Sequence, residues 1–334
     1  MFKASFRQMA RNSSRILLLA LLIVLIPFVP ASAQGRGGRG QQFEPEPLKW
    51  RFMGPSVGNR IAAVAGVPSD PNIYYAGAAS GGVWKSTDGG ATFAPIFDGM
   101  RVAAIGALAV APTDPKIVWA GTGEAWAIRP SDVIGDGIYK SEDAGMTWTH
   151  LGLDETGRIG RIIVHPTDAN VVYACALGRL SGSQPERGVF KTTDGGRTWN
   201  RVLFADENTG CSGLTMDPKD PNVLFADMWQ VEIHPWAMLS GGPGSAIYVT
   251  RDGGAKWTKV THPGLPKSPV GKIDVAIAPT DSNRVYALIS DRRSRFSVAI
   301  RRRWRLVEGG ELGSRAHRPR RLLHPARDLA RQRR

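Results

Sequence analysis

Carboxylates, basic side chains and tryptophans gather in three irregular stretches of this 334-residue sequence. Flat aromatic faces can stack on sugar rings, and polar groups beside them can bind sugar hydroxyls. We therefore expect a ligand-binding site that draws on seven side chains: Trp126, Arg129, Arg187, Trp229, Gln230, His234 and Trp236. Loop tryptophans can also fill gaps between neighbouring sheets, and this alternative stays open.

Glycoside hydrolysis would make a further demand on the same stretches. Glycosidases use two carboxyl groups, about 5–5.5 Å apart for retention or about 6.5–9.5 Å apart for inversion. Four carboxylates are candidates, and if the protein is an enzyme we expect the pair Glu124 and Asp136 to be catalytic; the other two are Asp132 and Glu232. His234 has no visible partner that would make it a general base. Nothing signals the nucleophile elbow of a serine hydrolase.

Two short motifs recur in step and define the elements that must position these side chains. The first is Pro-x-Asp followed by a β-rich run, and it begins at Pro68, Pro112, Pro166, Pro218 and Pro279. The second is Ser/Thr-x-Asp-x-Gly-x-x-aromatic. Its starts are 55, 51 and 58 residues apart, at Ser86, Ser141, Thr192 and Thr250. This period is typical of a four-stranded propeller blade, about 40–50 residues plus insertions.

Each repeat reads as four strands. An apolar run precedes the Pro-x-Asp turn, a second strand follows it, a third leads into the Asp-x-Gly turn, and a fourth follows that turn. We therefore predict an all-β fold, a β-propeller of four-stranded blades with about four to five blades present in an incomplete ring. The loops between second and third strands then lie opposite the Asp-x-Gly turns, and they contain the irregular stretches described above.

The aspartates of the second motif are predicted to be structural. Their carboxylates can accept bonds from amides of their own turn, and the aromatic residue that ends each motif anchors the hairpin. A calcium loop needs several oxygen ligands in one stretch, whereas each motif offers one or two carboxylates. We expect no metal and no cofactor, and structural roles for Asp88, Asp143, Asp194 and Asp252.

The second motif is the Asp-box, and with it the chain resembles the secreted bacterial Asp-box (BNR-repeat) proteins, which are glycosyl-hydrolase-like and sortilin-like β-propellers. Three further stretches carry the resemblance: GPSVGNRI from Gly54, ERGVFKTTDGG from Glu186 and GGPGSAIYVTRDGG from Gly241. The resemblance covers roughly Trp50 to Ser290. The proteins that the chain resembles include the xyloglucanases. For a xyloglucanase, the resemblance implies a catalytic Asp just before a Gly-Gly pair in the first blade. Ser80 stands at that place here, so whether the protein is an enzyme stays open.

The net charge of +14 is concentrated at the two ends of the chain. Residues 34–290 are close to neutral, so they have no electrostatic footprint for a nucleic acid. Residues 1–33 combine basic residues, the eleven apolar residues Ile16–Ile26 and the sequence Ala-Ser-Ala, which is typical of a secretory signal. We expect cleavage after Ala33, export to the periplasm or the extracellular space, and no stable membrane span afterwards. A Gly/Arg/Pro-rich linker at 34–46 and the partial propeller at 47–290 would follow.

Export would permit a disulfide between the two cysteines. Cys175 and Cys211 both lie in apolar runs, and Cys211 fills a position that is Ile in three other repeats, at Ile61, Ile105 and Ile159. Two buried small apolar side chains are therefore the favoured interpretation. A disulfide stays open as the alternative, because the sequence does not give the geometry.

The repeat pattern stops after Ser290, and residues 291–334 contain 15 Arg and no Lys. We hypothesise that this Arg-rich tail is out-of-frame translation, because a one-base shift near residues 300–306 can read as a fifth Asp-box. The alternative is a basic disordered tail. Since four or five blades leave sheet edges unpaired, we expect a purified 34–334 chain to be insoluble or oligomeric.

Two classes of function follow from these observations. The chain is predicted to be a module that binds a polysaccharide, an oligosaccharide or a peptide within a larger sortilin-like protein. The alternative is a glycoside hydrolase that acts on a polysaccharide through its loop carboxylates.

Overall fold

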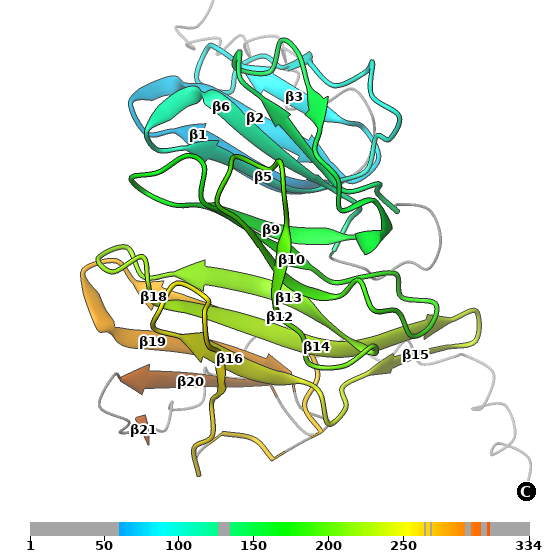
Figure 1. The fold of residues 1–334 in the computed structure, drawn as a ribbon, viewed down its shortest axis with the longest axis vertical. Helices are drawn as coiled ribbons and strands as arrows, with labels where there is room; N and C mark the ends of the chain where they lie inside the picture. The colour runs from blue at the N-terminus through cyan, green and yellow to red at the C-terminus, as the bar shows by residue number, and fades with distance from the viewer. Residues whose placement is uncertain are drawn as a thin grey trace, which may run out of the picture. The chain divides into compact units, whose positions relative to one another are not determined.

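The computed structural model describes residues 60–125, 134–263, 265–267 and 269–290, together with the strands at 295–301 and 306–307. These residues form five antiparallel sheets that follow one another along the chain (Figure 1). The all-β prediction is confirmed, and the one short helical turn described is the 3-10 turn η1 (Asp154–Thr156). Within the described part of the chain, no helix has the length and apolar character needed to cross a membrane.

Four of the five described sheets contain four strands in chain order, as the repeat analysis predicts, and the fourth sheet has one additional strand. The first sheet consists of β1 (Ile61–Val67), β2 (Asp70–Ala78), β3 (Val83–Ser86) and β4 (Ala94–Pro95). The second consists of β5 (Ile105–Ala111), β6 (Asp114–Thr122), β7 (Ile138–Ser141) and β8 (Thr149–His150). The third consists of β9 (Ile159–Val164), β10 (Val172–Ala176), β11 (Gly188–Thr192) and β12 (Asn200–Leu203).

The fourth sheet has a fifth strand, and the fifth sheet continues past Ser290. The fourth consists of β13 (Thr209–Met216), β14 (Leu224–His234), β16 (Ala246–Thr250) and β17 (Thr258–Lys259), and β15 (Ala237–Ser240) pairs with the end of β14. The fifth consists of β18 (Ile273–Ala278), β19 (Asp281–Ser290), β20 (Arg295–Arg301) and β21 (Leu306–Val307). The last two strands lie in the Arg-rich tail, and the hypothesis that this tail is out of frame stays a prediction.

The two sequence motifs meet at one end of each of the first four sheets. The Pro-x-Asp turn closes on itself, because its aspartate accepts a bond from the amide two residues on, as Asp70 does from Asn72 at 2.9 Å. The Asp-box turn then donates an amide to the same segment. Four such bonds, 2.8 to 3.1 Å long, run from Gly89 to Asn72, Ala144 to Lys116, Gly195 to Asn170 and Gly253 to Asn222.

The hydrophobic core lies between successive sheets. One cluster joins each adjacent pair, and each cluster takes residues from the second strand of one sheet and the first strand of the next. Tyr75 of β2 and Leu108 of β5 belong to one such cluster, for example. Because apolar residues pack on both faces of the inner sheets, each inner sheet is stabilised mainly by its two neighbours.

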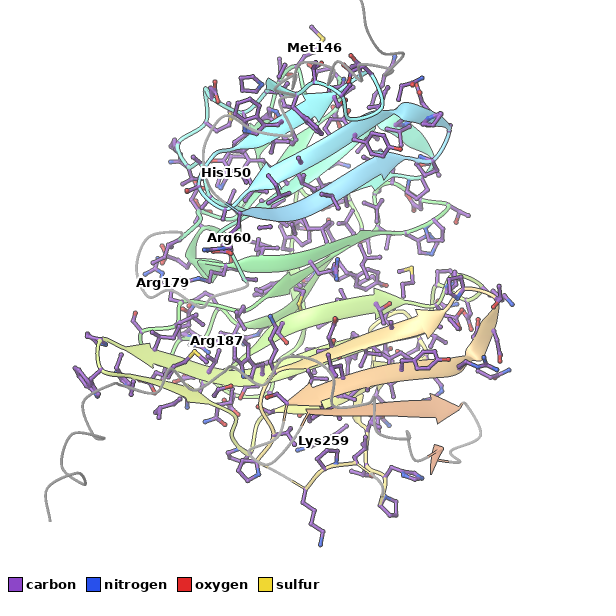
Figure 2. All side chains as sticks on the ribbon, turned by 180° about the vertical axis from the view of Figure 1, so that it is seen from behind. Arg60, Met146, His150, Arg179, Arg187 and Lys259 are labelled. Carbon is purple, nitrogen blue, oxygen red and sulfur yellow. A yellow bond between two sulfur atoms is a disulfide. The ribbon has the colours of Figure 1, made fainter. Side chains whose placement is uncertain are left out.

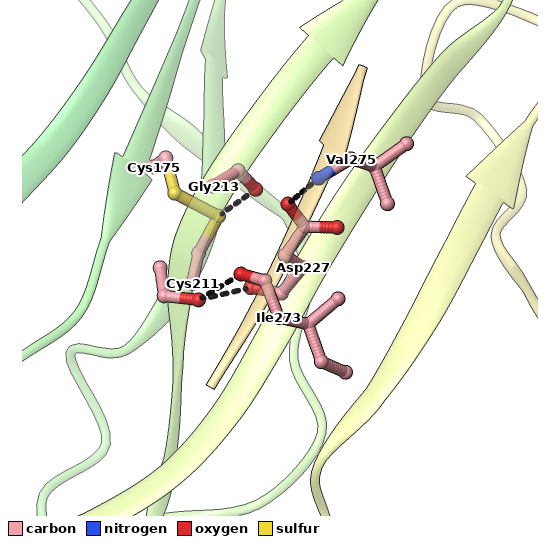
Figure 3. Close-up of a disulfide and its surroundings, with 7 residues drawn as sticks. Cys175, Cys211, Gly213, Asp227, Ile273 and Val275 are labelled. Atoms are coloured by element: carbon pink, nitrogen blue, oxygen red, sulfur yellow. Dashed lines mark hydrogen bonds between the residues drawn. A yellow bond between two sulfur atoms is a disulfide. The ribbon is translucent and has the colours of Figure 1, made fainter. Parts of the chain in front are cut away.

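One repeat position at these sheet-to-sheet contacts explains why the two cysteines lie close enough to pair. A side chain at Gly77 would meet Ile105 at 2.5 Å, and one at Gly121 would meet Ile159 at 2.6 Å, so glycine is needed there. In the third sheet the same position is Cys175, and it forms a disulfide with Cys211 of the fourth (Figure 3). The interpretation of two unpaired cysteines is therefore wrong, because their Cα atoms are 5.1 Å apart across this contact.

Candidate functional site

The irregular stretches lie opposite the Asp-box turns, as predicted, but the one in the fourth sheet is a β-hairpin. Strand β14 runs on to His234 and turns back as β15, so that Ile233 pairs with Met238 (Figure 1). The signal that could have found this hairpin is the alternation of buried Val231 and Ile233 with the more exposed Glu232 and His234. We call residues Val231–Ser240 the β14–β15 hairpin.

Two of the expected ligand residues, His234 and Trp236, lie at the tip of this hairpin, beside the candidate carboxylate Glu232. The indole of Trp236 is 81% exposed. It stacks on the imidazole of His234, with ring centroids 5.2 Å apart and planes 7° from parallel. His234 Nε2 lies 3.2 Å from a carboxylate oxygen of Glu232. The tip therefore holds one face of an aromatic ring in a fixed orientation, beside polar groups that face solvent.

Trp229 and Gln230 lie at the base of the hairpin and are largely enclosed. Trp229 is buried, its indole nitrogen donates to Ser240 Oγ at 3.1 Å, and the ammonium of Lys272 lies 5.4 Å from its ring centroid. Gln230 Oε1 accepts a bond from the amide of Gly244 at 3.3 Å. Trp229 is packed against its neighbours and also lines the cavity described next, and Gln230 holds the next turn. A ligand role for either residue stays a prediction.

A cavity of about 700 Å³ lies beside Trp229, where the first strands of the sheets approach one another. Its wall includes apolar residues of β1, β5 and β18 and also Met238 and Ser240 of β15. Its charged groups are Arg161, Lys272 and Asp274, and three serine hydroxyls also line it: Ser212, Ser240 and Ser290. Burial lowers the pKa of Lys272, against the opposing charges of Asp274 and Glu124. The hairpin therefore runs from an exposed aromatic tip to the edge of a mixed apolar and charged cavity.

The two expected catalytic carboxylates are engaged in separate networks. Glu124 is buried and holds Arg60 in a two-point ion pair, with Arg60 Nε 2.7 Å from Glu124 Oε1. Asp136 accepts from the Tyr139 hydroxyl at 2.8 Å, and Arg101 lies 3.4 Å away. Burial first, and this bond second, raise the pKa of Tyr139 to about 12. Each of the two carboxylates therefore has a structural partner.

Arg187 is buried in the loop of the third sheet and binds the main chain. Its guanidinium donates to the carbonyls of Asn208 at 2.7 Å and Gly182 at 2.8 Å, and also to that of Arg179. Figure 2 shows Arg60, Arg179 and Arg187 on the same side of the ribbon. These bonds join two loops, and a ligand role for Arg187 stays a prediction. Trp126, Arg129 and Asp132 lie outside the described residues.

The Asp-box aspartates occupy the structural place predicted for them. In the second box, Asp143 accepts from the Ser141 hydroxyl at 2.8 Å and from the Thr147 amide and hydroxyl at 2.8 and 2.6 Å. The Thr147 hydroxyl bond is the main reason that the pKa of Asp143 falls to about 2. The box tryptophan reaches the preceding sheet rather than its own, because Trp148 donates to the carbonyl of Ile96 at 2.8 Å. Asp88, Asp194 and Asp252 sit in equivalent turns, and in the described residues no three His, Cys, Asp or Glu side chains gather as metal ligands would.

Sequence reasoning missed Asp227 on β14. Its side chain is fully buried, one oxygen accepts from the Val275 amide at 3.0 Å, and the other has no partner among the described residues (Figure 3). Desolvation raises the pKa of Asp227 to about 7. Its position in the repeat matches Gly77, Gly121 and Cys175, and that register is the signal that could have placed it at a sheet-to-sheet contact.

Comparisons with known proteins agree with this architecture. Residues 136–264 match the family model Sortilin-Vps10, described as "Sortilin, neurotensin receptor 3". The chain is 26% identical over 228 residues to a xyloglucanase of a Paenibacillus species, a match that covers 62% of this chain and 21% of the relative. A xyloglucanase of Hypocrea jecorina is 26% identical over 231 residues, which is 62% of this chain and 26% of the relative. The chain thus spans about a fifth to a quarter of these curated relatives.

Two solved structures have the same fold. An ancestral GH74 enzyme matches with a TM-score of 0.57 and 22% identity, over 77% of this chain and 33% of that one. The GH74 enzyme of Niastella koreensis matches with a TM-score of 0.54 and 21% identity, over 74% and 38%. The fold and the boxes define an Asp-box β-propeller. Within this class, the chain resembles the sortilin-like and glycosyl-hydrolase-like proteins.

Proposed function

We propose that this chain is a glycan-binding β-propeller module whose ligand stacks on Trp236 at the tip of the β14–β15 hairpin. The observation that carries the proposal is the exposed Trp236 indole, held parallel to the His234 ring. An aromatic ring that is already oriented loses little conformational entropy when a sugar ring stacks on it. The carboxylate of Glu232 lies beside the stack and can accept hydrogen bonds from sugar hydroxyls.

The alternative function is glycoside hydrolysis, and the xyloglucanase relatives are the reason to consider it. Binding is supported over hydrolysis by the interactions that the two candidate catalytic carboxylates already make. Glu124 forms an ion pair with Arg60, and Asp136 accepts a hydrogen bond from Tyr139. A glycosidase needs one carboxyl group free to attack or to activate water and one free to protonate the leaving group. Ser80 also replaces the acid that the xyloglucanase resemblance implies.

Export through residues 1–33 is part of the same proposal. It is supported by the disulfide between Cys175 and Cys211, because disulfides persist in oxidising compartments. A module in that location would meet polysaccharides outside the cytoplasm. A peptide ligand is the other candidate for the same hairpin, and the experiment below distinguishes it.

The test is calorimetric titration of the chain with xyloglucan oligosaccharides and, separately, with an unstructured peptide library. We expect oligosaccharide binding that Trp236→Ala weakens by roughly tenfold or more, with an unchanged melting temperature, because the side chain is mostly solvated. Met146→Ala is the matched control, since Met146 is an exposed apolar residue of a box turn.

Three results would overturn the proposal. Equal binding by Trp236→Ala would remove the hairpin from the site. Binding of peptides alone would replace the glycan with a peptide. Release of shorter sugars that Glu124→Gln or Asp136→Asn abolishes would establish the hydrolase instead.

A further inference from the structure

The β14–β15 hairpin extends beyond the rest of the fourth sheet and has two different faces (Figure 1). Its inner face packs on the molecule, because Val231 and Ile233 are buried in one hydrophobic cluster with Leu180 of the third sheet's loop. The amide of Ile233 also donates to the carbonyl of Leu180 at 2.7 Å. These contacts fix the hairpin on the loop 178–187 by one face and leave the other face to solvent.

The outer face combines aromatic, apolar and acidic groups. Residues that pair directly across two antiparallel strands share a face of the sheet. The pairs on this face are Glu232 with Leu239 and His234 with Ala237. Leu239 is 54% exposed, the side chain of Glu232 is 37% exposed, and the indole of Trp236 stacks on His234 at the tip. We call these five residues the outer face.

The charge of the outer face is negative. With histidine counted as neutral, Glu232 carries the one formal charge of residues 231–240. Arg187 is buried, donates to three main-chain carbonyls, and is shared between the charges of Glu232 and Asp206. The ammonium of Lys272 lies against the tryptophan ring at the base of the hairpin, where burial lowers its pKa. Both cations are thus engaged below the outer face, while Glu232 meets solvent.

An exposed indole beside a carboxylate selects a ligand that combines a ring with a positive charge. A tryptophan face attracts cations more strongly than other aromatic rings do. A carboxylate forms its strongest hydrogen bonds with charged donors. The apolar side of a sugar ring stacks on the same indole face. A sugar with an ammonium group therefore satisfies both side chains at once, whereas a neutral sugar leaves the charge of the carboxylate without a counter-charge.

We propose that the glycan bound on the outer face contains amino sugars with a free amino group, with the ring on Trp236 and the ammonium bonded to Glu232. Leu239 lies across the hairpin from Glu232 and provides apolar surface for the neighbouring sugar. N-acetylation removes the charge of the amine, so acetylated units lack the preferred contact. This inference rests on the proposed function, because it names the ligand class of the same hairpin.

The charge of the whole chain makes the proposed preference specific. With a net charge of +14, the chain attracts anions over long range. Non-specific association would therefore favour an acidic polysaccharide and disfavour a polycation. Tighter binding of a cationic glycan than of a neutral one requires a local carboxylate at the site of binding, such as Glu232.

Calorimetric titration of the full chain with three β-1,4-linked hexasaccharides tests the proposal. The three ligands differ at one group, because their units are glucose, glucosamine or N-acetylglucosamine. At about pH 7, we expect the glucosamine hexamer to bind roughly tenfold more tightly than either of the others. Raising the salt concentration from about 0.05 to about 0.5 M should reduce that advantage and leave the other two affinities unchanged, because exposed charges are screened.

Two variants of Glu232 separate its charge from its place in the structure. Glu232→Gln keeps the shape and removes the charge, so the glucosamine hexamer should bind no better than the glucose hexamer. Glu232→Asp keeps the charge and should keep most of the preference. Glu142→Gln is the matched control, since Glu142 is a 73% exposed carboxylate of an Asp-box turn, ion-paired with Lys140. Circular dichroism checks that each variant folds.

Three results overturn the proposal. They are equal affinities for the three hexamers, a preference for glucosamine that Glu232→Gln retains, and equally tight binding of hexalysine, which would assign the outer face to a basic peptide. If the glucose hexamer binds through Trp236 and the amino group adds nothing, the proposed glycan-binding function stands and this inference fails. If Trp236→Ala leaves the binding of every hexamer unchanged, both fail.

Discussion

Asp227 is a carboxyl group in an apolar contact between two sheets. Its one bond, from the Val275 amide, favours the charged form, and Arg161 does the same. Burial and the neighbouring carboxylate of Asp274 oppose them and dominate, so the pKa of Asp227 rises from 3.8 to about 7. The folded protein therefore holds a proton that the unfolded chain has already released at pH 6.

This difference predicts a pH dependence of stability. Where the folded state binds more protons than the unfolded state, the free energy of unfolding falls as pH rises. The contribution of Asp227 should be fully present below about pH 4 and lost by about pH 7. Urea unfolding measured at a series of pH values checks this, and Asp227→Asn should flatten that part of the profile. Asp274→Asn should instead move its midpoint to lower pH, and a wild-type profile that rises from pH 4 to pH 7 would contradict the assignment.

The Asp-boxes differ in one hydrogen-bond donor, so they show how a threonine hydroxyl affects the pKa of the box aspartate. Asp88 and Asp143 each accept a threonine hydroxyl and have a pKa of about 2. In the fourth box Lys256 replaces that threonine, and the pKa of Asp252 is lowered mainly by the Thr250 hydroxyl. Lys256→Thr should therefore lower the pKa of Asp252 further, toward that of the other boxes.

An NMR titration of the side-chain carboxyl carbons measures this prediction directly. Lys256→Val is the control, because it removes the same positive charge but provides no hydroxyl. If the valine variant lowers the pKa as much as the threonine variant does, the hydroxyl bond is not the cause.

The disulfide and the glycines are alternatives at one position of the sheet-to-sheet contact. The bond closes a loop of 36 residues, so its loss should cost about 4 kcal/mol of unfolding free energy. Cys175→Gly with Cys211→Ile would rebuild the pair that Gly77 forms with Ile105. We expect this double variant to recover part of the stability that Cys175→Ala with Cys211→Ala loses.

Thermal melts in the presence of a reductant compare the two double variants with the reduced wild type. Equal melting temperatures for both double variants would show that the glycine and isoleucine pair is not interchangeable with the disulfide.

The strands were predictable because the turns that connect them have sequence motifs whose side chains form hydrogen bonds within the turn itself. Asp70 and Asp88 bond within their own turns, so the Pro-x-Asp and Asp-box signals act locally and survive in any context. The β14–β15 hairpin was not predicted, because irregular composition at Pro235 and Gly241 hid the alternation of Val231 and Ile233. Its turn is formed by Pro235 and Trp236, a pair that is not one of the strong two-residue hairpin signals.

At the scale of the whole molecule, the repeat predicted the order of the sheets but not the contacts between them. The pairing of Cys175 with Cys211 depends on how far apart two sheets lie, and a spacing of 36 residues does not contain that distance. The same holds for the site. Trp236 was predicted as a ligand residue and lies exposed, whereas the partners of the buried Glu124 and Arg187 come from distant positions such as Arg60 and Asn208.

The disulfide also sets the order in which this molecule can come apart. Core clusters of the described residues join each sheet to the next, so unfolding can begin at either exposed end and proceed sheet by sheet. The link between Cys175 and Cys211 ties the third sheet to the fourth. Fraying from the two ends therefore converges on one covalently joined pair of sheets. We therefore expect that pair to be the last of the five described sheets to lose protection of its amides against hydrogen exchange.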